Sequence, residues 1–130
     1  MTSCELETSK NGKLDGMWHL VSVDTLSTGG FNDMTYNKVY WSFQGKLLQI
    51  DDKTGARASV FFRFNHQPSS LDLSDPHIKD RMNGDPVITD VKDISPFGIN
   101  ALEEKFSVES LSSGKMILKS PTLRLYFRKM

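Results

Sequence analysis

The chain has 130 residues, of which 38% are hydrophobic and 25% charged, and its sixteen lysines and arginines balance its sixteen aspartates and glutamates. This length fits one domain with a single core, and eight phenylalanines supply large apolar groups that a disordered chain lacks. A net charge of zero argues against nucleic-acid binding, and a single cysteine excludes an intrachain disulfide.

Residues 1–14 are mostly polar, and no apolar periodicity runs through them. This composition predicts a flexible tether, after which residues 15–130 form one folded domain. No apolar run in the chain is long enough to cross a membrane.

The start of the chain is similar to a lipoprotein processing site. Residues 1–4 read MTSC, which resembles the end of a bacterial lipobox, and Glu5 and Glu7 resemble the acidic stretch after the lipidated cysteine of some surface lipoproteins. The resemblance implies lipidation at Cys4 as the one membrane attachment. It also implies the cell envelope of a Gram-negative bacterium as the location, in the periplasm or anchored to the outer membrane. The alternative is a free thiol in a polar tail.

From residue 16 onward, short segments rich in β-branched and aromatic residues alternate with turns of glycine, serine, aspartate and proline. We predict strands at 17–23, 38–43, 46–50, 57–64, 70–73, 105–111, 115–119 and 122–129. Most consecutive strands are joined by turns short enough for hairpins. Such a sheet protects its edges by closing on itself, so we expect an all-β fold, an antiparallel up-and-down (meander) barrel of about eight strands.

The stretch 65–100 interrupts this regularity, because it holds four of the five prolines. We predict one helical turn over 76–82 with Asp75 as its cap, and an irregular excursion otherwise. The excursion contains enough apolar side chains to fold back onto the sheet. We therefore expect it to pack over one barrel opening, with Phe97 and Ile99 as anchors.

The first predicted strand begins with Gly16-Met17-Trp18, which resembles the Gly-x-Trp signature of lipocalins. In that family an arginine near the end of the last strand packs over the tryptophan, and either Arg124 or Arg128 fits this role. The resemblance covers roughly residues 15–130, and its C-terminal part is similar to small bacterial lipocalin-like (calycin-type) domains, many of them lipoproteins of unassigned function. Other lipocalin signatures, such as an acidic Thr-Asp-Tyr-type turn, are not recognisable.

Aromatic side chains on the predicted strands and the excursion either fill the core or line a ligand cavity. These candidates are Trp41, Phe43, Phe62, Phe64, Phe97 and Phe106. Arg124 and Tyr126 point the same way on the last strand, and in the related fatty-acid-binding barrels such a pair grips a carboxylate. The opposite face of that strand carries leucine and phenylalanine, which normally point inward, so the pattern favours an outward Arg124.

Motifs of hydrolases, nucleotide-binding enzymes and zinc proteases are absent from the sequence, and its three histidines lack the spacing of metal ligands. We therefore expect a monomeric, non-enzymatic binding protein with no metal or other cofactor. Its ligand would be a small apolar or amphipathic molecule in or at the barrel mouth. The alternative is a protein-interaction or inhibitor module with a filled barrel, which meets its partner through the 65–100 loop.

Overall fold

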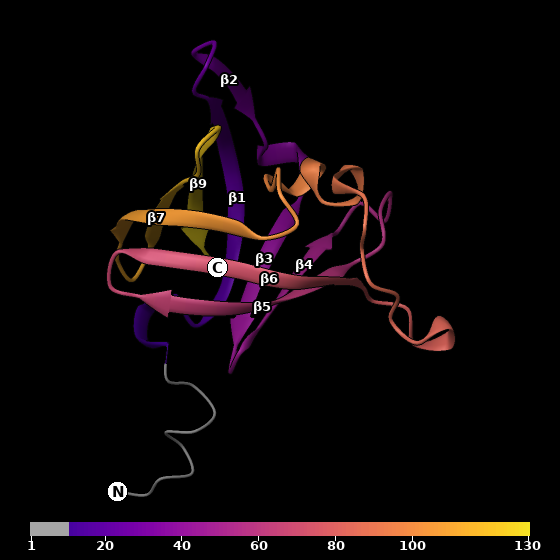
Figure 1. Cartoon of the computed structure of the whole chain (residues 1–130). Coiled ribbons are helices and arrows are strands. Elements are labelled where there is room, and N and C mark those ends of the chain that lie inside the picture. The colour runs from indigo at the N-terminus through magenta and orange to yellow at the C-terminus, as the bar shows by residue number, and fades with distance from the viewer. Residues whose placement is uncertain (1–10) are drawn as a thin grey trace, which may run out of the picture.

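A computed structural model describes residues 11–130, in which nine strands form one antiparallel sheet. The first strand also pairs with the last, so the sheet closes into a barrel (Figure 1). The strands are β1 Gly16–Thr25, β2 Gly30–Asp33, β3 Val39–Gln44, β4 Leu47–Asp52, β5 Val60–Gln67, β6 Ser70–Ile78, β7 Glu104–Leu111, β8 Lys115–Lys119 and β9 Leu123–Lys129. Eight of them make the barrel in meander order, which confirms the predicted fold class.

β1 is the strand that joins the two ends of the sheet. One of its edges pairs with β9 from Trp18 to Thr25, while the other pairs with β3 near the start and with β2 from Ser22 onward. All four residues of β2 are exposed, and the sequence gives them no alternation, so this strand was not predicted.

The barrel interior is filled by its own side chains. Alternate residues of the strands point inward and are buried, as in β9, where Leu123, Leu125 and Phe127 face the core. At the centre, the Trp41 ring makes edge contacts with Phe127 at 4.8 Å and with Phe106 at 5.9 Å between ring centroids. Rings packed in this way fill the part of the interior around Trp41.

β6 runs five residues beyond its predicted end, so the predicted helical turn over 76–82 is wrong. Asp75 adopts a left-handed φ of 53°, and the pairing of β5 with β6 shifts register at this point. The irregularity lets the strand continue through Pro76, which cannot donate a ladder hydrogen bond. A single 3₁₀ turn, η3 (Arg81–Asn83), follows after the strand has ended.

The second half of the excursion covers one end of the barrel, as predicted. Two short 3₁₀ helices, η4 (Val91–Asp93) and η5 (Ser95–Phe97), lie beside η2 (Thr35–Asn37) at this end (Figure 1). The segment buries Ile88, Ile94, Phe97 and Ile99 in the common core. Phe97 and Ile99 are both fully buried, in agreement with their expected role as anchors.

The opposite end of the barrel is closed by the first described residues. Leu14, in the 3₁₀ helix η1 (Gly12–Leu14), is fully buried, and its carbonyl accepts a 2.9 Å hydrogen bond from Trp18 Nε1. The predicted tether therefore does not extend to residue 14, because an apolar side chain and a backbone carbonyl there complete the core. Residues 1–10 of that segment, including Cys4, lie outside the described residues.

Candidate functional site at the barrel mouth

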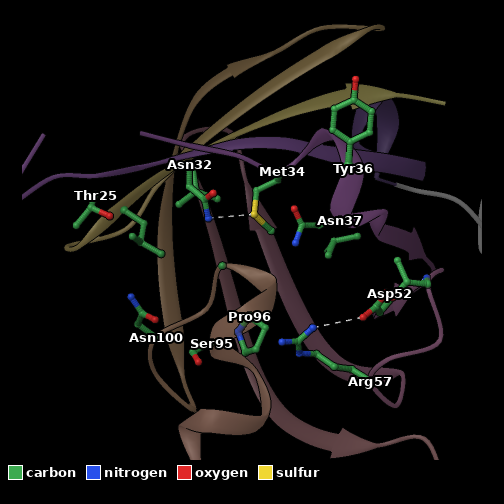
Figure 2. Close-up of a pocket in the computed structure, with 15 residues that line it drawn as sticks. Thr25, Asn32, Met34, Tyr36, Asn37, Asp52, Arg57, Ser95, Pro96 and Asn100 are labelled. Carbon is green, nitrogen blue, oxygen red and sulfur yellow. Dashed lines mark hydrogen bonds and ion pairs between the residues drawn. The ribbon is translucent and has the colours of Figure 1, made fainter. Parts of the chain in front are cut away.

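A hollow of about 480 Å³ opens at the end of the barrel that η4 and η5 cover, and we call this hollow the mouth (Figure 2). Its walls come from the β1–β2 hairpin, η2, the turn after β4 and the segment 95–100. The fifteen lining residues are Val23, Thr25, Asn32, Met34, Tyr36, Asn37, Val39, Asp52, Thr54, Arg57, Ser95, Pro96, Gly98, Asn100 and Leu123.

The floor of the mouth is apolar. Val23, Met34, Val39 and Leu123 belong to the buried core and also line the hollow. Gly98 lets the cover pass close to β9: its φ is 92°, and a Cβ there would lie 3.0 Å from a Leu125 methyl carbon. The floor thus separates the hollow from the filled interior.

Arg57 supplies the positive charge of the mouth. Its Nη1 lies 3.5 Å from Asp52 Oδ2, and its side chain is 51% exposed while that of Asp52 is 2% exposed. Figure 2 shows the guanidinium pointing from the turn after β4 into the hollow. Because a guanidinium has five N–H donors, this contact leaves donors free for a bound anion or polar group.

Asp52 holds this turn in place. Its Oδ1 accepts hydrogen bonds from the backbone N–H and the hydroxyl of Thr54. Burial raises the pKa of Asp52, but the hydrogen bonds from Thr54 and the charge of Arg57 outweigh it, so the pKa lies below its ordinary value. Asp52 is therefore negatively charged at neutral pH and positions Arg57.

Asparagines and short hydroxyl side chains complete the rim. Asn32 Nδ2 contacts the Met34 sulfur at 3.4 Å, and Asn100 Nδ2 donates to Thr122 Oγ1 at 3.1 Å. The backbone N–H of Asn100 donates to Glu104. Burial raises the pKa of that carboxyl. The rim can thus donate and accept hydrogen bonds around an apolar floor.

Residues 11–130 hold neither an arrangement of metal ligands nor a membrane-crossing helix. No group of three or more histidine, cysteine, aspartate or glutamate side chains in this part of the chain is arranged to hold a metal ion. None of its helices has the length and apolar character needed to cross a membrane.

Comparison with known proteins identifies the family. The family model of the lipocalin-like domain matches residues 1–130. The chain belongs to this lipocalin-like family. A lipocalin-like protein from Bacteroides uniformis has a similar structure, with a TM-score of 0.68 and 20% identity over 92% of this chain and 100% of that one. An uncharacterized protein from Bacteroides eggerthii gives a TM-score of 0.66 and 17% identity over 90% of this chain and 99% of that one. These two likenesses concern the fold alone, and no curated protein matches the chain.

The aromatic residues proposed as ligand contacts do not line the mouth of this lipocalin-like domain. Trp41, Phe43, Phe62 and Phe106 are buried inside the barrel, and Phe97 lies in the cover. Phe64 is half-buried against Phe43, with ring centroids 5.1 Å apart. Their positions fit the alternative in which they fill the core.

Arg124 and Tyr126 point outward, as the alternation along β9 favoured. Arg124 Nε donates to Glu109 Oε1 at 2.7 Å, and Tyr126 Oη donates to Asp24 Oδ2 at 3.1 Å. Both side chains therefore engage carboxylates of the protein itself on the outer surface, away from the barrel interior. The hydrogen bond from Arg124 lowers the pKa of Glu109.

The cation over Trp18 is a lysine, although the family resemblance implied Arg124 or Arg128. Lys129 Nζ lies 4.6 Å from the centroid of the Trp18 ring. Lys129 is paired with Trp18 across β1 and β9 and shares the inward side of Phe127, whereas Arg128 lies on the outer face. Gly16, with a φ of 113°, makes room for it, since a Cβ there would lie 2.8 Å from Lys129 Cε.

The sequence did not predict the mouth residues, because they lie in turns and at strand ends that are spread over 100 residues of the chain. The sequence feature that pointed toward this site was the irregular segment 65–100, which we expected to pack over one barrel opening. No spacing motif connects Arg57 with Asn32 or Asn100.

Proposed function

We propose that this lipocalin-like domain is a non-enzymatic binding protein that holds a small amphipathic molecule at its mouth. The observation that carries the proposal is the half-exposed Arg57, fixed by buried Asp52 beside an apolar floor. The apolar part of a ligand would rest on Val23, Val39 and Leu123. An acidic or strongly polar group would accept hydrogen bonds from Arg57.

The dimensions and composition of the mouth support binding. A volume of about 480 Å³ falls within the range of roughly 300–1,000 Å³ that is common for small-molecule sites. The lining residues include no histidine, cysteine or lysine, and the one carboxylate among them is engaged by Thr54 and Arg57. The hydroxyl–carboxylate contact among these residues, Thr54 with Asp52, holds the turn after β4.

The proposal can be tested with 8-anilinonaphthalene-1-sulfonate, a probe that combines apolar rings with an anionic group. Titration into isotopically labelled protein should shift amide resonances of the mouth, above all those of residues 32–37, 52–57 and 95–100. Arg57→Gln should weaken binding about tenfold, because it removes charge-assisted hydrogen bonds.

Lys53→Gln is the matched control, since Lys53 is an exposed cation on the same turn that does not line the hollow. It should leave the affinity within about twofold. Equal weakening by both variants, or shifts confined to other surfaces, would refute binding at the mouth.

A protein-interaction role is the second candidate, and a specific observation favours it. The core is packed with the barrel's own side chains, and the segment between β6 and η4 presents exposed apolar side chains, with Met82 96% exposed and Val87 62% exposed, although residues 86–88 pair with β6. Beside it, a hollow of about 660 Å³ on the outer face of the sheet is lined by Leu47, Phe61 and Arg81, among others. Protein partners commonly bury such exposed apolar side chains. Probe shifts in this groove, with none at the mouth, would favour this role.

A further inference from the structure

The end of the barrel opposite the mouth carries a concentration of positive charge. Five cationic side chains gather there, in the first turn, the β3–β4 turn, the start of β8 and the end of β9: Lys13, Lys46, Lys115, Arg128 and Lys129. We call this set the basic end. Across residues 11–17, 43–47, 112–116 and 127–130, Asp15 is the single side-chain carboxylate. Among the described residues, this end of the barrel therefore carries a net positive charge, although the chain as a whole has none.

Contacts between these segments show that the basic end is one continuous surface. Lys129 Nζ donates to the Lys13 carbonyl at 3.1 Å, and the Lys129 backbone N–H donates to the Gly114 carbonyl at 2.9 Å. Asn11 Nδ2 donates to the Gly45 carbonyl at 2.9 Å, which brings Lys46 beside the first turn.

Two of the cations are direct neighbours. Lys115 and Arg128 are paired across β8 and β9, both are exposed, and none of the ion pairs within residues 11–130 involves either of them. Like charges directly opposite each other on a sheet destabilise it. Lys119 and Arg124 form another pair of cations opposite each other on the same two strands. There the repulsion is reduced by a carboxylate, because Glu109 forms an ion pair with Arg124 at 2.7 Å. Lys115 and Arg128 have no such carboxylate within residues 11–130, so an anion from outside the domain can bind them.

Exposed apolar side chains accompany these charges. Met17, Leu47 and Met130 are 36%, 47% and 64% exposed, and the backbone N–H of Met130 donates to the Met17 carbonyl. Cations beside exposed apolar side chains are typical of surfaces that bind the headgroup region of a bilayer. Nucleic acid offers aliphatic side chains no comparable partner, and the exposed aromatic residues that could stack on bases lie at the other end: Tyr36 lines the mouth, and Phe31 is on β2, which pairs with the end of β1.

We propose that the basic end binds an anionic phospholipid surface, with the mouth facing away from the membrane. Lys13, Lys46, Lys115 and Arg128 would contact lipid phosphates, while Met17, Leu47 and Met130 enter the interface. The inference is independent of ligand binding at the mouth, because the two surfaces share no residue.

The test is flotation of the purified chain with vesicles. Vesicles of equimolar phosphatidylcholine and phosphatidylglycerol should bind it at low salt, and those of phosphatidylcholine alone should not. Each cation near such a surface contributes about a fivefold factor, so the triple variant K46E/K115E/R128E should bind about 100-fold more weakly or worse. Raising the salt should weaken binding by the unaltered chain through screening.

The control is the triple variant K38E/K53E/K92E, which has the same net charge but changes exposed cations elsewhere. It should retain most of the binding, and circular dichroism should show that both variants fold. Equal loss in both variants, or equal binding to vesicles without phosphatidylglycerol, would overturn the proposal. Binding to a DNA oligonucleotide that exceeds vesicle binding and disappears in K46E/K115E/R128E would reassign the surface to nucleic acid.

Discussion

Trp18 offers the sharpest test of how the closed end of the barrel is held together. Its ring is fully buried, its Nε1 donates to the Leu14 carbonyl at 2.9 Å, and Lys129 Nζ lies over its face. Trp18→Ala should cost about 3–5 kcal/mol of unfolding free energy, as other large-to-small core changes do. Trp18→Phe keeps most of the apolar contact but leaves the buried Leu14 carbonyl unpaired, which should cost about 1–3 kcal/mol.

A double-mutant cycle can measure how much the contact between Lys129 and Trp18 contributes to the free energy of unfolding. Lys129→Met keeps a long apolar side chain and removes the charge, and its coupling to Trp18→Ala should be about 0.5–1 kcal/mol. Urea denaturation followed by far-ultraviolet circular dichroism measures all four proteins. Additive costs for the two substitutions would refute the cation–ring contact, and a Trp18→Phe cost below about 0.5 kcal/mol would refute the hydrogen bond to Leu14.

Three further predictions concern the mouth and its cover. Gly98→Ala should destabilise the domain by about 1–3 kcal/mol in thermal or urea unfolding, because φ is left-handed and the new methyl meets Leu125; no loss of stability would show that the cover sits differently. Glu104→Gln should raise stability by about 1 kcal/mol at neutral pH, since burial penalises the ionised carboxyl. This gain should vanish as the pH falls through the raised pKa of Glu104, and a gain that persists in acid would contradict the burial argument. Asp52→Asn should cost about 1–3 kcal/mol near neutral pH, since the depressed pKa of Asp52 means that its ionised form stabilises the fold. Unfolding curves of this variant and the unaltered chain should converge as the pH drops through that pKa, and a constant difference would exclude a role for the charge.

Sequence patterns predicted the strands where short runs of strand-forming residues are bounded by clear turn residues. The segment 115–119 was placed with its observed bounds, and the prediction for 105–111 differs from the observed strand by a single residue, because turns of serine, glycine and proline at 112–114 and 120–121 mark their ends. β2 lacks such a pattern, since all its residues are exposed and it is held by backbone pairing with β1. The second half of β6 was missed because Asp75-Pro76 has the composition of a helix start, and only the pairing with β5 shows it to be a strand irregularity.

The site was less accessible to sequence analysis than the fold. Arg57 is one cation among several in the turns, and nothing in its neighbourhood of the sequence distinguishes it from Lys53. Its importance depends on Asp52 and on a floor built from three distant strands, which only the closed barrel brings together. Lys129, by contrast, was predictable in principle, because alternation from Phe127 places it on the inward side.

The pairing of β1 with β9 joins the beginning of the domain to its end, and the hydrogen bond from Tyr126 to Asp24 spans 102 residues. During synthesis, β1 therefore has no partner on that edge until the last strand has left the ribosome. A partly made sheet has two open edges, and open edges pair readily with other chains. Chains that stop before β9 should accordingly aggregate, and the complete chain should fold slowly for its size, because its decisive contact is also its most distant one.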